Sequence, residues 1–353
     1  MGLFLSIMPF EKGPENLKKT IAVAVAALFL AAALVPRASA WGKTGHIYAN
    51  SAAVKTLPPE TSLAKFFGAN QAFLAAHSSD PDVWRGEQHV EGEAPHHFID
   101  LDAYGTPSDF ALLNLPVKRA DADVKFGHAL VESKGTVDWT IDLWTGRLSD
   151  AMKGSDSDLI LADAAILGHY VADSHVPFHA SVNYDGQLSG QRGIHARFES
   201  QMVENTIKLT DLTPDPAQPI TDVLGSARLW SGQSVDLVPT ILQADIEARV
   251  QATLAGKAVL DAGPLPAGSV GDTRRPLPKD GSPPSDYYAD NPVYWKTFSA
   301  ITRPIALARL NASASHLGSL WLTAWQRAGS PDLSKLKAPT ANVPVPVADP
   351  DAK

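Results

Sequence analysis

Residues Asp158–His179 have the sequence DLILADAAILGHYVADSHVPFH. Its apolar residues recur at the three- and four-residue intervals of an amphipathic helix, which predicts a helix over 158–174. Pro177 should end that helix, because proline lacks the backbone N–H that the next turn needs. His169 and Asp173 lie four residues apart, so both side chains should leave one face of the helix and converge on one cation.

Similar spacing continues through the rest of the chain and predicts an all-α protein. Further helices are expected over 194–209, 220–230, 241–260 and 294–328, the last kinked or divided at Pro304. Only His97–Leu101 suggests a short extended piece. We therefore expect one mostly helical domain, 41–334, with a loop-rich insertion at 263–292, where Pro, Gly, Ser and Asp crowd together, and a disordered tail at 335–353.

The first forty residues resemble an export signal. Lys18 and Lys19 precede an apolar run, Ile21–Val35, and the small residues Ala38–Ala40 follow it. The run is shorter than the roughly 20 apolar residues that a membrane-spanning helix requires. We therefore expect a signal peptide at 1–40, starting at Met1 or Met8, with cleavage near Ala40 and a secreted or periplasmic product.

Composition limits the possible chemistry. The 353 residues include 11 His and no Cys, and 38 Asp and Glu outweigh 30 Lys and Arg. A net charge of −8 argues against binding nucleic acid or an anionic membrane through a broad basic face. Without cysteine there is no disulfide, no thiolate metal site and no thiol nucleophile. A transition-metal site must therefore use His, Asp, Glu and backbone groups.

Several short motifs offer such groups. His195 and Glu199 repeat the four-residue spacing of His169 and Asp173, and His179 lies between the two pairs. Imidazole and carboxylate without thiolate suit a catalytic zinc better than a structural one. One such pair alone is more often a surface ion pair, but two pairs with a histidine between them are harder to explain in that way.

Three further segments hold candidate groups. Cleavage after Ala40 would expose Trp41 in Trp-Gly-Lys-Thr-Gly-His46, so its amine and carbonyl could chelate a metal with that histidine. The segments 79–85 (SDPDVWR) and 95–100 (PHHFID) add carboxylates and imidazoles. Each of these segments, taken singly, is also compatible with an ordinary polar loop.

Together these motifs resemble one known superfamily. A Trp-Gly-x-x-Gly-His start, a His-x-x-x-Asp-x-x-x-x-x-His core and a downstream His-x-x-x-Glu in an exported helical protein are similar to the trinuclear-zinc superfamily. That superfamily unites the zinc-dependent phospholipases C with the single-strand-specific type I nucleases. The resemblance spans Trp41 to Glu199, and Arg309-Leu310-Asn311 also looks like the superfamily's C-terminal region.

The resemblance implies three zinc ions per chain. It assigns Asp82, His97 and His169 to the first zinc with Asp173 bridging, then Trp41, His46 and Asp173 to the second, and His179, His195 and Glu199 to the third. Asp80 could replace Asp82, and His96 could replace His97. We favour Asp82 because Arg85 follows it three residues later, and His97 because Phe98 follows directly, as in the nuclease branch.

The resemblance also implies a reaction. A zinc-held hydroxide would attack phosphorus while Asp82 orients it and Arg85 neutralises the phosphoryl oxygens. Phe98 would stack on an unpaired base and Asp100 would accept a hydrogen bond from it. These roles belong to a hydrolase of single-stranded DNA and RNA that leaves 5′-phosphate products and also acts on 3′-nucleotides.

Two other functions remain open on the sequence. A zinc-dependent phospholipase C would share the metal residues, although Arg85, Phe98 and Asp100 favour the nuclease. The other alternative is a non-catalytic zinc-binding export protein. Such a protein would usually have lost at least one ligand, whereas all the expected ligands are present here. For the processed protein we expect no stable insertion into a membrane and no obligate protein partner.

Overall fold

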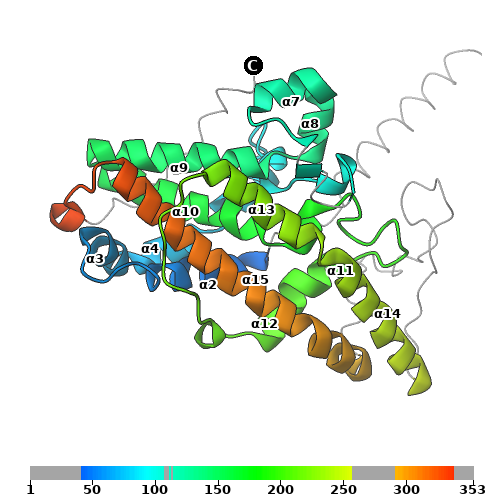
Figure 1. The fold of residues 1–353 in the computed structure, drawn as a ribbon. Helices are drawn as coiled ribbons and strands as arrows, with labels where there is room; N and C mark the ends of the chain where they lie inside the picture. Colours follow the sequence, from blue (N-terminus) through cyan, green and yellow to red (C-terminus); the bar gives the residue numbers. More distant parts are fainter. Residues whose placement is uncertain (1–40, 107–110, 113, 257–290, 338–353) are drawn as a thin grey trace, which may run out of the picture. The chain divides into compact units, whose positions relative to one another are not determined.

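The computed structural model describes residues 41–106, 111–112, 114–256 and 291–337 (Figure 1). All of them belong to one compact unit, Ala38–Lys353. The predicted signal peptide at 1–40 lies outside the described residues, as do 263–290 of the predicted insertion and 338–353 of the predicted tail. Within the described residues, no helix is both long and apolar enough to cross a lipid bilayer.

The described residues form helices and loops without a strand, which confirms the all-α prediction. The α-helices are α2 (Gly42–Val54), α3 (Ser62–Ala69), α4 (Gln71–Ala76), α5 (Asp80–Gly86), α7 (Arg119–Phe126), α8 (His128–Lys134), α9 (Val137–Gly154), α10 (Ser157–Ser174), α11 (Ile194–Ala196), α12 (Val203–Thr206), α13 (Val223–Val235), α14 (Val238–Leu254) and α15 (Pro292–Arg327). Short 3₁₀ helices are η1 (Ala94–His97), η2 (Leu101–Ala103), η3 (Pro177–Ala180), η5 (Leu209–Asp211) and η7 (Leu333–Lys335), and η4 (Arg197–Met202) is a π-helix.

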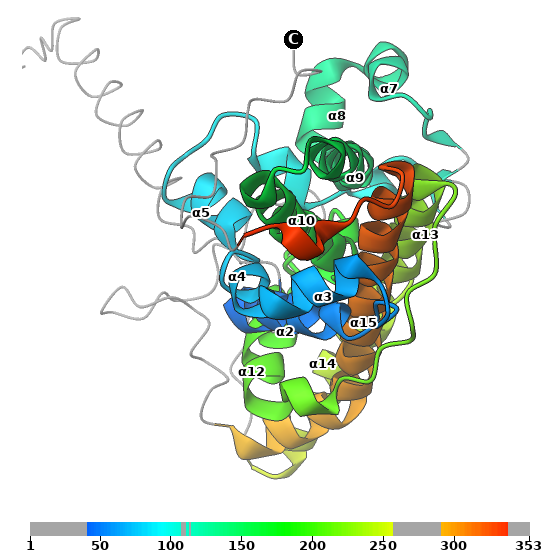
Figure 2. The same cartoon turned by 90° about the vertical axis from the view of Figure 1, so that its left-hand side faces the viewer.

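Helix α10 lies at the centre of this unit. The Asp156 side chain accepts hydrogen bonds from the N–H groups of Asp158 and Leu159, which fixes the helix start. From Ile160 to Ser174 every residue is buried, so α10 is enclosed on all sides rather than amphipathic. It packs against α2, α9, α13 and α15, and Figure 2 shows it between α9 and α2. A central helix of this kind can hold polar side chains away from water.

Helix α15 runs alongside α2, α9, α10 and α14. It continues as one helix across Pro304, so the proline does not divide it as the sequence suggested. Trp321 of α15 is fully buried, and its indole N–H donates to the Ala164 carbonyl of α10 at 3.1 Å. The C-terminal helix therefore fixes the position of α10 although it lies far away in the sequence.

The helix predicted over 194–209 has an irregular form in the structure. It begins as α11, widens into η4 and finishes as α12, and the chain is extended at Ile207. π-helical turns are uncommon and occur often at functional sites. Here the π-helix contains Glu199 of the predicted His195–Glu199 pair, and His195 lies in α11 just before it.

Candidate metal centre

Helix α10 supplies the first two candidate ligands. His169 and Asp173 are fully buried on one face of the helix, with His169 Nε2 3.3 Å from Asp173 Oδ2. His169 Nδ1 lies 2.9 Å from the Ser78 carbonyl oxygen, which can only accept, so this nitrogen carries the proton. Nε2 therefore faces Asp173, and in the neutral form of the ring its lone pair can bind a metal ion.

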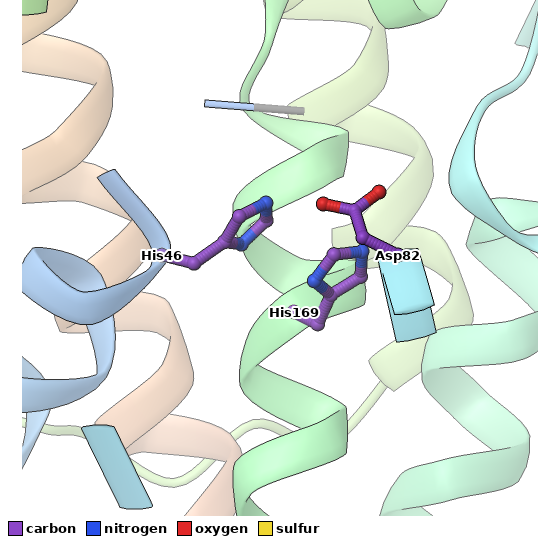
Figure 3. A group of neighbouring side chains, drawn as sticks. All are labelled: His46, Asp82 and His169. Atoms are coloured by element: carbon purple, nitrogen blue, oxygen red, sulfur yellow. The ribbon is translucent and has the colours of Figure 1, made fainter. Parts of the chain in front are cut away.

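Helix α2 brings His46 against the same point. Its ring stacks on the ring of His169 at 4.0 Å between centroids, and its Nε2 lies 3.5 Å from Asp173 Oδ1. Figure 3 shows His46, His169 and Asp82 converging from α2, α10 and α5 respectively. The three side chains come from distant parts of the sequence; His46 and His169 are buried and Asp82 is partly buried.

Trp41, at the start of α2, lies between the two ends of the site. Its backbone N–H donates to Glu199 Oε2 at 3.1 Å, and its indole N–H donates to the Ala172 carbonyl at 2.8 Å. A Cβ at Gly45 would lie 2.6 Å from the Cβ of Trp41, so the glycine of the Trp-Gly-x-x-Gly-His motif makes room for the tryptophan. The backbone nitrogen predicted to become a free amine therefore faces candidate metal ligands.

Two residues from short helices, His97 and Asp82, complete this side of the cluster. His97 in η1 is fully buried, with Nδ1 2.9 Å from His169 Nε2 and 3.0 Å from Asp173 Oδ2. Asp82 Oδ1 in α5 lies 3.9 Å from His97 Nδ1 and accepts a hydrogen bond from Arg85 at 2.8 Å. The guanidinium predicted to contact phosphoryl oxygens is thus anchored beside the cluster.

The structure also distinguishes the residues that the sequence left open. Asp80 pairs with His77 at 2.8 Å, and His96 lies 3.4 Å from Glu93. Within the part of the chain that the structure describes, Asp82 and His97 belong to groups of side chains that could hold a metal, and Asp80 and His96 do not. Geometry therefore favours Asp82 and His97 as candidate ligands.

A second cluster forms around Glu199. His195 Nε2 lies 2.8 Å and His179 Nε2 lies 3.8 Å from Glu199 Oε2. His179 in η3 donates from Nδ1 to the carbonyl oxygen of His97 at 2.6 Å, which leaves Nε2 toward the carboxylate. Since Trp41 contacts Glu199 and His97 contacts His179, the two clusters are physically joined.

Among the described residues, three groups have ligand atoms close enough to hold metal ions. They are His46, Asp82 and His169; His97, His169 and Asp173; and His179, His195 and Glu199. The third group consists of the three residues predicted for the third zinc. In the first two groups, Asp82 lies with His46 rather than with His97, and His169 belongs to both. Asp173 Oδ1, Glu199 Oε1 and His195 Nδ1 are buried without a hydrogen-bond partner. Buried polar atoms of this kind fit ligands of a cation.

Burial and mutual proximity shift the pKa values in this region. Burial, followed by the charge of Arg85, lowers the pKa of His97 well below its usual range. Burial likewise raises the pKa of Asp173 to about 7, against the opposing effect of His169. Burial opposes the charged form of His169, but the Asp173 and Asp82 carboxylates raise its pKa to about 9. A region that crowds carboxylates and imidazoles without solvent is suited to a cation that replaces the protons.

The predicted base-binding residues lie beside the first cluster. Phe98 is partly exposed, and its carbonyl accepts a hydrogen bond from Val137 at 3.1 Å. Asp100 is mostly buried, 3.3 Å from Lys134 Nζ, and burial raises its pKa to about 6 although Lys134 opposes the shift. The structure thus adds Lys134, which the sequence did not suggest, as a neighbour of Asp100.

Sequence reasoning also missed Glu93. This carboxylate is 2% exposed, and it lies 3.0 Å from His97 Nε2, on the opposite side of the ring from Asp173. Glu93 precedes His97 by four residues, the same interval that drew attention to His169 and Asp173. That spacing is the signal that could have found it.

Comparison with known proteins identifies one family. The family model of the S1/P1 nucleases matches residues 41–207, a range that contains all nine predicted metal ligands and ends before α13. No curated protein and no solved structure matches the chain.

Proposed function

Because the chain belongs, over residues 41–207, to the S1/P1 nuclease family, whose members are hydrolases acting on phosphodiester bonds, we propose that it is an exported, zinc-dependent, single-strand-specific nuclease. Its substrates would be single-stranded DNA and RNA, cleaved to 5′-phosphate products, together with 3′-nucleotides. The observation that carries the proposal is the convergence of three metal-capable groups from α2, α5, α10, η1, η3 and the α11–η4 segment.

The donor set supports zinc as the metal. Imidazole nitrogens and carboxylate oxygens without thiolate are typical of catalytic zinc sites. Three ions would be held by Trp41, His46, Asp82, His97, His169, Asp173, His179, His195 and Glu199. Bound zinc would polarise the phosphodiester and lower the pKa of a water molecule that attacks it.

The surrounding residues would orient the substrate. The contact of Arg85 with Asp82 holds the guanidinium beside the cluster, where its planar fork can bind phosphoryl oxygens. The partly exposed ring of Phe98 would stack on an unpaired base. A base inside a duplex already stacks on both faces, so this contact would favour single strands.

Export is part of the proposal. The predicted cleavage near Ala40 would convert the Trp41 nitrogen, now an amide that faces Glu199, into an amine able to bind metal. In a secreted or periplasmic protein, removal of the signal peptide during export would therefore also create the amine that completes the metal site.

The test uses the purified chain beginning at Trp41, saturated with zinc. It should hydrolyse single-stranded DNA, RNA and 3′-AMP, act on duplex DNA at a much lower rate and leave phosphatidylcholine intact. Asp173→Asn should abolish hydrolysis, whereas Asp163→Asn, a matched change on the same helix, should preserve it. Release of phosphocholine without nuclease activity would replace the proposal with a phospholipase C, and inactivity on every substrate would leave a zinc-binding protein.

A further inference from the structure

Glu93 is a buried acid whose role the proposed reaction does not explain. Its Oε1 atom accepts a hydrogen bond from the Tyr170 hydroxyl at 2.8 Å and lies 3.0 Å from His97 Nε2, while Oε2 lies 3.4 Å from His96 Nδ1. A carboxylate enclosed in this way has little freedom to change its position. It forms a fixed acceptor on one side of an imidazole ring.

The other side of the same ring faces the candidate metal centre. His97 Nδ1 lies 3.0 Å from Asp173 Oδ2 and 2.9 Å from His169 Nε2. A neutral imidazole has one N–H and one lone pair, and an ionised carboxylate can only accept. Asp173 could accept a hydrogen bond from Nδ1 and Glu93 one from Nε2. When a cation occupies the Nδ1 side, Glu93 is the acceptor that holds the proton on Nε2 and directs the lone pair of Nδ1 to the centre.

We infer that Glu93 is a positioning residue, which fixes the ring orientation and tautomer of His97 so that Nδ1 can bind a metal ion. The inference rests on the proposed metal-dependent function. Carboxylates that accept the second N–H of a metal-bound histidine orient the ring and raise its basicity, and their loss typically costs about 10- to 100-fold in metal affinity or activity. Glu93 would act through His97 without touching substrate.

The experiment measures zinc binding directly. The apo forms of the parent, Glu93→Gln and Glu93→Ala are titrated with zinc against a chromophoric chelator. The affinity for the zinc ion held by His97 should fall by about 10- to 100-fold in Glu93→Ala and by less in Glu93→Gln, whose amide oxygen can still accept the Nε2 proton. The remaining zinc ions should keep their parent affinities. Glu91→Gln, an exposed acid two residues earlier, is the matched control and should bind zinc like the parent.

A second readout separates positioning from a general effect on folding. Cobalt(II) substituted for zinc should give visible absorption bands that shift in Glu93→Gln and stay unchanged in Glu91→Gln. Tyr170→Phe, which removes one donor and keeps the carboxylate, should retain zinc affinity within about threefold. If Glu93→Ala does not fold, Glu93→Gln decides the question through its affinity and its cobalt spectrum.

Parent-like zinc affinity and an unchanged cobalt spectrum in Glu93→Gln would overturn the inference, as would equal weakening of all the bound ions. If the parent binds zinc but hydrolyses no nucleic acid, the proposed function fails while the role of Glu93 remains testable. If the parent binds no zinc, both fail.

Discussion

Asp173 lies where the candidate ligands meet. Oδ2 is 3.0 Å from His97 and 3.3 Å from His169, while Oδ1 is 3.5 Å from His46. The four-residue spacing was sufficient to predict the pairs His169–Asp173 and His195–Glu199, because a helix brings such residues together without further information. For Asp82 and His97, which lie in α5 and η1, the sequence offered Asp80 and His96 as alternatives and favoured Asp82 and His97 only by their resemblance to the nuclease branch. The folded chain adds that Asp82 and His97 belong to metal-capable groups.

The Arg85 guanidinium should stabilise the phosphoryl oxygens of the substrate. Arg85→Lys replaces a planar fork held by Asp82 with a single flexible charge, so stabilisation of phosphoryl oxygens should weaken. We expect kcat on single-stranded DNA to fall roughly 100-fold, with zinc content unchanged. Steady-state kinetics with metal analysis checks both. A parent-like kcat would exclude Arg85 from the reaction, and lost zinc would give it a structural role.

The absence of a side chain at Gly135 leaves room for Phe98. At φ +82° a Cβ on Gly135 would lie 2.0 Å from the Phe98 carbonyl oxygen and 2.7 Å from its ring, so Gly135→Ala must displace Phe98. We expect kcat/KM for single-stranded DNA to fall roughly tenfold, mainly through KM, because the base would lose its stacking surface.

Gly127→Ala is the matched control for this change. Gly127 also has a positive φ, +90°, but a Cβ there meets nothing within 4 Å. Both variants carry the backbone strain of alanine in this conformation, and only one moves Phe98. Equal kcat/KM in the two variants would contradict a role for Phe98 in substrate binding.

At the scale of elements, the C-terminal end of α10 depends on α15. Arg309 of α15 donates to the His175 carbonyl at 3.2 Å, to the Trp230 carbonyl at 2.9 Å and to Ser234 Oγ at 2.6 Å. Burial lowers the pKa of Arg309 to about 10, so the side chain remains charged at neutral pH. A cation at the end of a helix also interacts favourably with the carbonyl dipoles there.

Arg309→Ala should therefore destabilise the protein by about 2–4 kcal/mol, since it leaves several buried acceptors without donors. Chemical denaturation of the zinc-free protein measures this effect. Arg327→Ala, at the exposed end of α15, should change stability by less than about 0.5 kcal/mol. Similar losses in the two variants would argue against anchoring of α10 by Arg309.

The contact between α9 and α13 should make stability depend on pH. Asp138 of α9 accepts a hydrogen bond from Ser231 at 2.6 Å, and burial raises its pKa from 3.8 to about 6. Below pH 3.8 the carboxyl is protonated in both the folded and unfolded states, so its burial does not reduce the free energy of unfolding through a charge. As the pH rises from 3.8 to about 6, the carboxyl ionises in the unfolded state while burial keeps it protonated in the folded state, so the folded state loses stability. The loss is complete once the pH exceeds about 6.

Asp138→Asn removes this titration and keeps an acceptor for Ser231. Relative to the parent, its free energy of unfolding should rise between pH 4 and pH 7 by up to about 3 kcal/mol. Denaturation of zinc-free protein at several pH values checks the difference. Asp150→Asn, an exposed change on α9, is the control. Parallel curves for Asp138→Asn and the parent would contradict the predicted penalty.

The helical periodicity identified α10 almost to the residue, because its cap and apolar spacing are local. The irregular 194–206 segment was not predictable in this way. Arg197 of the π-helix is fully buried and donates to Asp245 at 3.1 Å and to the Tyr294 hydroxyl at 3.0 Å. Tertiary contacts with α14 and α15 thus accompany the widened turn, and no local pattern contains them.

At the scale of the molecule, helices far apart in the sequence enclose the metal-capable groups in one buried region. The family match ends at residue 207, yet α13 and α15 pack against α10 and the segments around it. The ligands could be proposed from motifs within 41–207, whereas the supporting role of the C-terminal helices required the folded structure.

We propose that this region holds three zinc ions. The measurement that decides this is the amount of zinc bound per chain, determined by elemental mass spectrometry on protein that begins at Trp41 and is dialysed after saturation with zinc. We predict a value close to three, and a value of two or fewer would contradict it.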